Sequence, residues 1–227
     1  MFYGLSFLWI IIFIVFILII TYDSMVESSH AILLTTYNNT PEKNKMYEDT
    51  IKWWLKNGNT EIFVVDSNNV GFPNVQSYKL YQFKFDQKKL FSSDQELVTN
   101  YEIHAMLQAF KFFQKKLQKY RYVVKITGKY KLPTLPYMLR RLNREEKDLI
   151  LQFRSENKGS HNTEYIGFKT SKIVNILECV HWKNKDFEKA IYECAEEKKL
   201  TKLQLPPIVV PKNYRVKRGN ASTLYFL

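Results

Sequence analysis

The sequence predicts an α/β fold, in which a mixed sheet that is parallel at least in its first half is flanked by helices. Short β-branched apolar runs alternate with amphipathic helical stretches, and polar residues follow the strand-like runs. The 227 residues include only seven glycines and seven prolines but sixteen phenylalanines and fifteen tyrosines. This composition supplies a hydrophobic core and argues against disorder, so we expect one domain over residues 30–227.

The chain begins with an apolar stretch, residues 1–21, that carries no charged side chain. Its length matches the ~20 residues that cross a ~30 Å hydrocarbon core. A cleaved signal peptide is the alternative, but no small-residue cleavage site follows Ile20. We therefore expect an uncleaved transmembrane signal-anchor over residues 1–21, in contact with the lipid bilayer, and a short stem over residues 22–29.

The acids Asp23 and Glu27 follow this stretch and favour a type II orientation, with the body outside the cytosol. We accordingly expect a single-pass membrane protein whose body lies in the Golgi or ER lumen. Two N-x-S/T sequences, at Asn38 and Asn220, would then be acceptors for N-glycosylation.

The first elements after the stem follow a strand–helix–strand–strand order. Residues 31–37 predict a buried strand, and Thr40, Pro41 and Glu42 provide the cap, proline and acid that begin a helix ending at Gly58. Residues 61–66 and 78–85 predict the second and third strands.

The later elements repeat this alternation. A capping box at 93–96 predicts a long helix through about Tyr120, and the apolar run 122–127 predicts the next strand. The remaining expected elements are strands at 149–153 and 165–168, helices at 171–180 and 186–199, and an extended segment at 205–210.

Three of these strands end in polar turns, which contain Thr35–Tyr37, Asp66–Asn68 and Thr127–Lys129. In open α/β sheets, ligands bind beyond the carboxyl ends of the strands. We therefore expect the three turns to converge on one ligand site.

The charge is concentrated around the last of these turns. Between residues 111 and 147, twelve Lys or Arg residues accompany only Glu145 and Glu146, a net +10 of the chain's +12. Such a field favours phosphate or another anion. The exposed helix lysines of this stretch, which are either a solvated face or a contact for lipid headgroups, are Lys111, Lys115, Lys116 and Lys119.

The strand ends and the helix before 122–127 resemble the nucleotide-sugar-binding half of GT-A type glycosyltransferases. The matching stretches are ILLTTYNNT at 32–40, EIFVVDSNN at 61–69 and YVVKITGKY at 122–130, with Glu102 on the intervening helix. The last stretch is also similar to the K-[IL]-T-G-R-Y signature of small viral and bacterial glycosyltransferase-like proteins, with Lys129 in place of their arginine. The resemblance covers residues 31 to about 135 and implies a GT-A, Rossmann-like mixed sheet.

This resemblance implies a membrane-anchored enzyme that moves a sugar from a nucleotide-sugar donor to a glycan, protein or lipid acceptor. The residues expected to bind the nucleotide-sugar are Thr35, Thr36, Tyr37, Asp66, Ser67, Lys125, Thr127, Gly128, Lys129 and Tyr130. An inverting displacement also needs a carboxylate within reach of the acceptor hydroxyl. Glu102 and Glu164 are the catalytic candidates, and the sequence does not choose between them.

The chain departs from the GT-A pattern because it contains no Asp-x-Asp, whose carboxylates hold Mg or Mn against the diphosphate. Lys125 and Lys129 are cations that can neutralise the diphosphate instead. We therefore expect no metal-binding residue and no required cofactor, although a divalent cation is compatible with the function. A catalytically inactive glycosyltransferase-like scaffold would also lack Asp-x-Asp, so that alternative stays open.

Simpler roles are open for several residues. Asp66 is also suited to begin an Asx-turn with Asn68, and Glu102 to be a solvated helix residue. Cys179 and Cys194 match no zinc pattern, and both burial and a bridge between them fit the sequence. A basic nucleic-acid-binding protein is a rival function, but no recognised binding module is present, so we expect no nucleic-acid partner.

Overall fold

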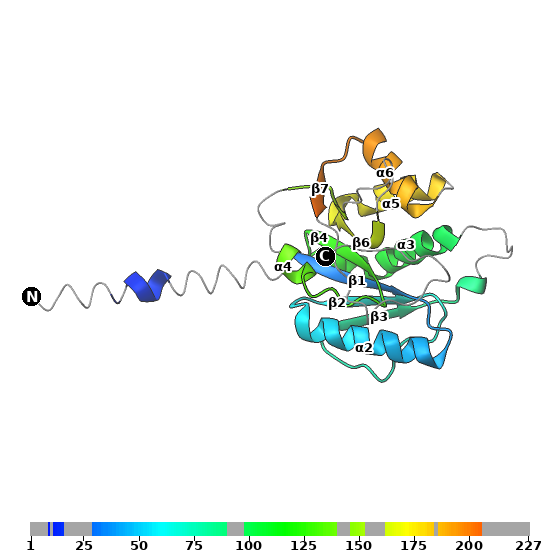
Figure 1. Ribbon diagram of the computed structural model, residues 1–227, viewed down its shortest axis with the longest axis horizontal. Coiled ribbons are helices and arrows are strands. Elements are labelled where there is room, and N and C mark those ends of the chain that lie inside the picture. The colour runs from blue at the N-terminus through cyan, green and yellow to red at the C-terminus, as the bar shows by residue number, and fades with distance from the viewer. Residues whose placement is uncertain are drawn as a thin grey trace, which may run out of the picture.

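The computed structural model describes residues 9, 11–15, 29–89, 98–139, 146–152, 162–183 and 186–205. Its centre is a seven-stranded mixed sheet of order β3-β2-β1-β4-β6-β5-β7, with helices on both faces (Figure 1). The strands are β1 (His30–Thr36), β2 (Ile62–Asp66), β3 (Leu80–Lys84), β4 (Tyr122–Thr127), β5 (Leu149–Gln152), β6 (Asn162–Lys169) and β7 (Lys202–Leu205). The predicted mixed α/β sheet is confirmed.

The helices alternate with these strands in the order that the sequence predicts, except for the short α4, which was not predicted. They are α2 (Pro41–Asn57), α3 (Val98–Leu117), α4 (Leu135–Leu139), α5 (Ile173–Trp182) and α6 (Phe187–Glu197), with short 3-10 turns at Gln87–Lys89 and Thr170–Lys172. Helix α2 begins as predicted, because the Thr40 side chain accepts a hydrogen bond from the Lys43 amide at 3.2 Å. The capping box predicted for the long helix, at 93–96, lies outside the described residues.

The first half of the sheet is parallel and the second half is mixed. Strands β1, β2, β3 and β4 run in parallel, whereas β6 pairs antiparallel with both β4 and β5. Strand β7 pairs parallel with β5. It begins at Lys202 rather than at 205, because its alternating residues are fixed by pairing with β5 and not by a long apolar run; residues 206–210 lie outside the described part.

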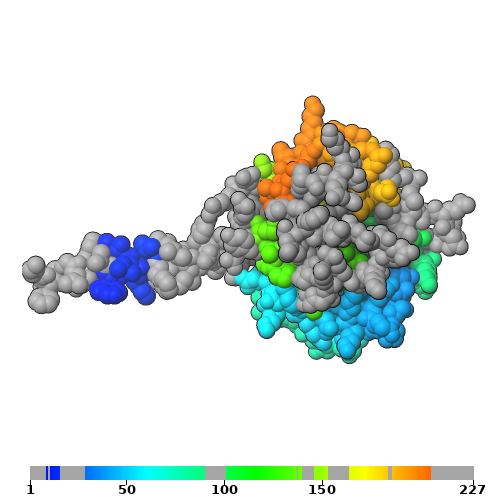
Figure 2. Space-filling model, viewed as in Figure 1, coloured from blue at the N-terminus to red at the C-terminus, as the bar shows by residue number. Residues whose placement is uncertain are grey.

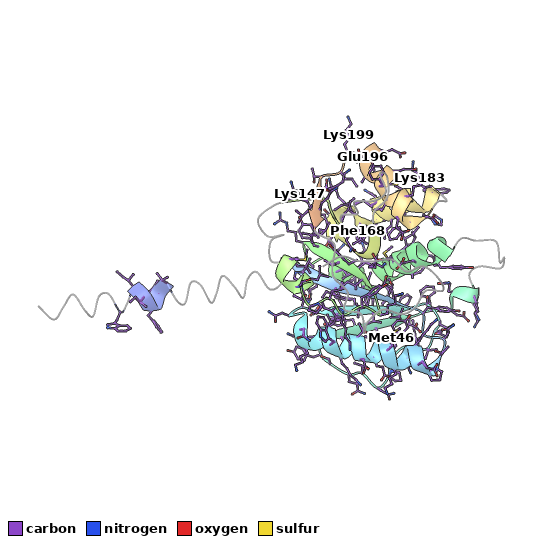
Figure 3. All side chains as sticks on the ribbon, in the orientation of Figure 1. Met46, Lys147, Phe168, Lys183, Glu196 and Lys199 are labelled. Atoms are coloured by element: carbon purple, nitrogen blue, oxygen red, sulfur yellow. A yellow bond between two sulfur atoms is a disulfide. The ribbon has the colours of Figure 1, made fainter. Side chains whose placement is uncertain are left out.

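A separate hydrophobic core lies on each face of the sheet. One core joins the sheet to α3, α5 and α6 through residues such as Leu33, Met106 and Ile191, and the other joins it to α2 and α4 through Ile32, Trp54 and Leu135. Figure 2 shows α2 and the α6–β7 region at opposite ends of the visible face. In Figure 3, Met46 on α2 lies far from Lys183 and Lys199, at the ends of α5 and α6.

A disulfide bond joins α5 to α6. The Sγ atoms of Cys179 and Cys194 are 2.11 Å apart, and the Cα atoms are 6.1 Å apart. Of the two alternatives that the sequence left open, the structure contains the bridge.

The amino-terminal stretch differs from the prediction. Residue 9 and residues 11–15 are helical, and the rest of the predicted anchor lies outside the described residues. Across the ranges of the chain that the structure describes, no helix has the length and apolar character needed to cross a bilayer. This finding overturns the predicted localisation as a single-pass membrane protein with a Golgi or ER lumenal body. Of the predicted stem, only Ser29 lies among the described residues.

Candidate functional site

The three polar turns do converge on one edge of the sheet. The register of the parallel strands pairs Thr36 with Asp66 and Thr35 with Thr127 across β1, β2 and β4. The antiparallel strand β6 begins at this same edge, where Tyr165 is the partner of Ile126. Residues from four strands therefore surround the place where α/β folds bind ligands.

Alternation along the strands divides these residues between the two faces of the sheet. Thr35 and Lys125 lie on the α3 face, because each is two residues from a member of the α3-side core. Thr36 and Gly128 lie on the α2 face by the same alternation. The edge thus carries two different sets of polar groups.

The α3 face holds a buried ion pair between Lys125 and Glu102. The Lys125 side chain is 1% exposed and the Glu102 side chain 28%. Lys125 Nζ also donates to Thr127 Oγ1 at 3.1 Å, and Thr35 Oγ1 donates to Glu102 Oε1 at 3.2 Å. A buried ammonium is costly unless it is paired and hydrogen-bonded, and this network provides both. Four of the predicted residues are therefore one connected unit.

The second candidate acid lies on the same face as this ion pair. Ile166 is the Cα partner of Lys125, and Glu164 is two residues before Ile166 on β6, so its side chain lies on the Lys125 side. Burial raises the pKa of the Tyr165 hydroxyl, and the negative charge of neighbouring Glu164 raises it further. The structure therefore places Glu102, from a helix, and Glu164, from a strand, on the same face of the sheet.

The α2 face is organised by the Asp66 carboxylate, which is 1% exposed. It accepts hydrogen bonds from the amides of Asn38 at 2.9 Å, Val70 at 2.9 Å and Gly71 at 3.0 Å. The Thr36 hydroxyl donates to it as well, at 3.2 Å. Asp66 thus fixes the loop after β1 and the loop after β2 relative to each other.

The neighbouring hydroxyls are also bonded within the protein. Ser67 Oγ donates to the Thr36 carbonyl at 3.1 Å, and the Thr36 hydroxyl also lies 3.1 Å from the Val65 carbonyl. Tyr37 is only half-buried, and its ring lies 5.7 Å from Lys43 Nζ. Tyr37 is therefore more accessible than Thr35 and Thr36, the predicted residues that precede it on β1.

Gly128 allows the turn after β4 to lie close against β1. A Cβ at this position would lie 2.5 Å from Thr36 Cγ2 and 2.9 Å from the Thr35 carbonyl oxygen, too close for any side chain. The Gly128 amide donates to that same carbonyl at 2.8 Å. The turn is therefore held against β1.

Lys129 and Tyr130 follow this turn at the rim of the edge. Both are half-buried, and Lys129 Nζ lies 5.0 Å from the centre of the Tyr130 ring. The Tyr130 carbonyl accepts a hydrogen bond from Trp54 Nε1 at 3.0 Å, which ties the segment to α2. Lys129 is therefore less enclosed than Lys125.

The acids at this edge are engaged within the protein. Glu102 is paired with the Lys125 ammonium, and Asp66 accepts hydrogen bonds from three backbone amides. In the described part of the chain, no three His, Cys, Asp or Glu side chains are grouped so that they could hold a metal ion.

Two residues of the site were not predicted from the sequence. Phe187, from α6, lies 5.9 Å from Lys125 Nζ, and nothing in the sequence marks this long-range contact. Asn38 is 2% exposed, and its Nδ2 donates to the Gly71 carbonyl at 3.3 Å. The prediction of Asn38 as a glycosylation acceptor is wrong, because its amide is enclosed; Asn220 lies outside the described residues.

No family model and no curated protein sequence matches the chain. Solved structures do align with it. The structure of CMP:2-keto-3-deoxy-manno-octonic acid synthetase complexed with CTP matches at 9% identity and a TM-score of 0.52, over 81% of this chain and 93% of that one. A glycosyltransferase involved in glycosylation of the major capsid of PBCV-1 matches at 9% identity and a TM-score of 0.52, over 78% and 82%.

A third structure, a candidate nucleotide-diphospho-sugar transferase from Desulfovibrio desulfuricans G20, aligns at 16% identity with a TM-score of 0.49, over 79% of this chain and 80% of that one. The two alignments with the higher TM-scores show that the chain is similar in fold to the synthetase and to the capsid glycosyltransferase.

Proposed function

We propose that the chain is a nucleotide-sugar-dependent glycosyltransferase that acts on a glycan, protein or lipid acceptor. One observation carries the proposal: the register of β1, β2 and β4 gathers the predicted donor-binding residues at the carboxyl edge of the sheet. The similarity in fold to a capsid glycosyltransferase and to a CTP complex supports it. The KITGKY run, with Lys125 and Lys129, supplies the cations that a diphosphate needs.

The proposal divides the predicted residues by what their contacts allow. Tyr37 and the backbone around Asn38 would contact the nucleoside, while Asp66 holds that backbone in place. Lys129, at the rim, would bind the diphosphate and stabilise the charge that develops on it as the sugar leaves. Lys125 is enclosed, so we assign it to fixing Glu102 and the end of β4.

Glu164 is the better candidate for removing the proton from the acceptor hydroxyl. In an inverting displacement, the acceptor oxygen bonds to the anomeric carbon, the bond from that carbon to the phosphate oxygen breaks, and the acceptor proton passes to a carboxylate. Glu102 is held by the Lys125 ammonium and the Thr35 hydroxyl, which suits it to a positioning role, and Glu164 is the other acid on this face of the sheet. We therefore assign proton removal to Glu164 and positioning to Glu102.

A non-enzymatic scaffold is the second candidate function. It is favoured by the internal bonding of Asp66, Thr36 and Ser67, which leaves these groups fewer ligand contacts than the sequence suggests. Such a scaffold would bind nucleotide-sugars weakly, or would bind them without hydrolysis or transfer.

The test is a calorimetric screen of UDP-, GDP- and CMP-sugars against the full chain, with EDTA and with Mn²⁺. We expect one nucleotide class to bind in EDTA, and that donor to be hydrolysed slowly or transferred. Binding that occurs only with Mn²⁺ would refute the metal-independent site. Binding without turnover would favour the scaffold, and no binding of any donor would refute both.

A further inference from the structure

The edge strand β3 and the outer side of α3 form a surface row of paired side chains. Strand β3 ends the sheet order, and alternate residues from it turn toward α3. We call this surface the aromatic ridge, and its six side chains are Tyr81, Phe83, Phe85, His104, Phe112 and Lys116.

The ridge has a regular geometry. Phe112 stacks on Phe83 with ring centres 4.4 Å apart and planes inclined by 21°. Phe83 in turn lies 5.8 Å from Phe85, again at 21°. At the two ends, Lys116 Nζ lies 4.2 Å from the centre of the Tyr81 ring, and the His104 ring lies 5.9 Å from that of Phe85. The rings of Phe112, Phe83 and Phe85 are thus stacked with nearly parallel planes.

The outermost ring of the ridge is open to solvent. Phe112 is 61% exposed, while its neighbour Phe113 is buried in the core beside Phe63. Phe113 and other buried residues of α3 pack on the sheet, whereas Phe112 lies at the edge of that core, against Phe113 and Phe83. One face of its ring covers Phe83, which leaves the other face for a ligand.

The surroundings of the ridge are cationic. No Asp or Glu occurs between residues 103 and 144, and the exposed lysines Lys111 and Lys115 are on the same helix as Phe112. Two acids border the ridge, and both are paired with lysines: Glu61 with Lys119 at 2.8 Å, and Asp86 with Lys89 at 3.9 Å. A partner of this surface must therefore carry negative charge as well as flat apolar faces.

The ridge is continuous with the candidate site. The Phe85 amide donates to the carbonyl of Asp66 at 3.0 Å, at the carboxyl end of β2. A chain that lies along the ridge would therefore end beside the loops that Asp66 holds. The ridge therefore suits a polymer, one end of which would lie in the candidate site.

We propose that the aromatic ridge binds an anionic glycan, a sugar chain that bears carboxylate, sulfate or phosphate groups. The apolar C–H faces of its sugar rings stack on Phe112, and its acidic groups meet Lys116 and the lysines beside it. That this glycan is the acceptor of the transfer reaction rests on the proposed function; the binding surface itself does not.

The experiment measures binding of a hexameric oligogalacturonate to the full chain, with its methyl-esterified, neutral form as the matched ligand. We expect the acid form to bind more tightly and to weaken with added salt. Phe112→Ala and Lys116→Gln should each weaken binding roughly tenfold, as expected for a contact near the centre of an interface. Phe112→Tyr keeps the ring and Lys52→Gln alters the opposite face, so both should bind like the parent.

Other outcomes overturn the proposal. Equal binding of the acid and ester forms would show that the charge of the glycan does not contribute to binding. Parent-like binding by Phe112→Ala would show that the aromatic ridge is not the binding surface. Tighter binding of oligothymidylate or of phosphatidylserine vesicles, lost in the same two variants, would assign the surface to nucleic acid or to lipid. Donor binding by the parent protein is measured separately, so failure of the proposed function is distinguished from failure of the ridge.

Discussion

Lys125 and Glu102 form an ion pair in which the ammonium is enclosed and the carboxylate reaches the surface of the candidate site. The pair joins β4 to α3, and Thr35 and Thr127 extend it to β1 and to the turn. Because a charge that is buried cannot be left alone, the pair links the stability of the sheet edge to the position of Glu102.

The first prediction concerns this linkage. Glu102→Gln removes the counter-charge and should lower the free energy of unfolding by about 3 kcal/mol, the lower end for a buried pair because Glu102 is partly solvated. Lys125→Met combined with Glu102→Gln should recover part of the loss. Urea unfolding measures both. The control is the i,i+4 pair of Glu48 and Lys52 on α2, in which the charged atoms are 3.9 Å apart and the lysine is 56% exposed; Glu48→Gln should cost under about 1 kcal/mol there. Equal costs at the two sites would contradict a buried pair.

The second prediction concerns Lys129. A hydrogen bond to a charged group contributes about 1.5–3 kcal/mol, so Lys129→Ala should weaken nucleotide-sugar binding roughly 10- to 100-fold. Lys129→Arg should retain most of the affinity, since it keeps the charge. Calorimetry on folded variants gives the values. Parent-like affinity in Lys129→Ala would mean that the diphosphate lies elsewhere.

The third prediction separates the two acids by kinetics. Glu164→Gln should lower kcat roughly 10²- to 10⁴-fold with little change in donor affinity, as for loss of a general base. Glu102→Gln should act mainly on stability. If Glu102→Gln abolishes turnover in a stably folded protein while Glu164→Gln does not, the two assignments are reversed.

The fourth prediction concerns the disulfide between α5 and α6. The bridge closes a loop with a sequence separation of 15 residues, for which chain entropy predicts about 3 kcal/mol of stabilisation. Reduction should therefore lower the midpoint of thermal unfolding, and Cys179→Ser with Cys194→Ala should match the reduced parent. Thiol titration verifies reduction. An unchanged midpoint after complete reduction would show that packing alone holds the two helices.

The fifth prediction concerns the stability of the fold at acidic pH. Burial lowers the pKa of His30 from 6.5 to about 4, so the folded state holds this residue neutral while the unfolded chain takes up a proton. Its contribution to stability is therefore complete above pH 6.5 and is lost as the pH falls toward 4, by about 3 kcal/mol in total. His30→Leu should flatten the unfolding free energy over this range. A parent-like slope in that variant would assign the acid sensitivity to other groups.

The sequence alone determined the order of the elements and most of their positions. Strands β1, β2 and β4 and the start of α2 follow from local signals, namely apolar runs, the Thr40 cap and Pro41, which act over a few residues. The gathering of polar strand ends was also predictable, because parallel strands place their carboxyl ends together. The apolar composition of residues 1–21 was a local signal as well, yet no helix in the described part of the chain is long and apolar enough to cross a membrane.

The tertiary structure decided which of these residues are accessible. Nothing near Lys125 in the sequence indicates that Glu102 and Phe187 enclose it, and nothing near Asp66 shows that it bonds to Val70, Gly71 and Asn38. The same holds for the bridge from Cys179 to Cys194 and for the pairing of β7 with β5. Local sequence sets the conformation of each segment, but burial and pairing depend on contacts between segments that are distant along the chain, and only the folded packing of those segments fixes them.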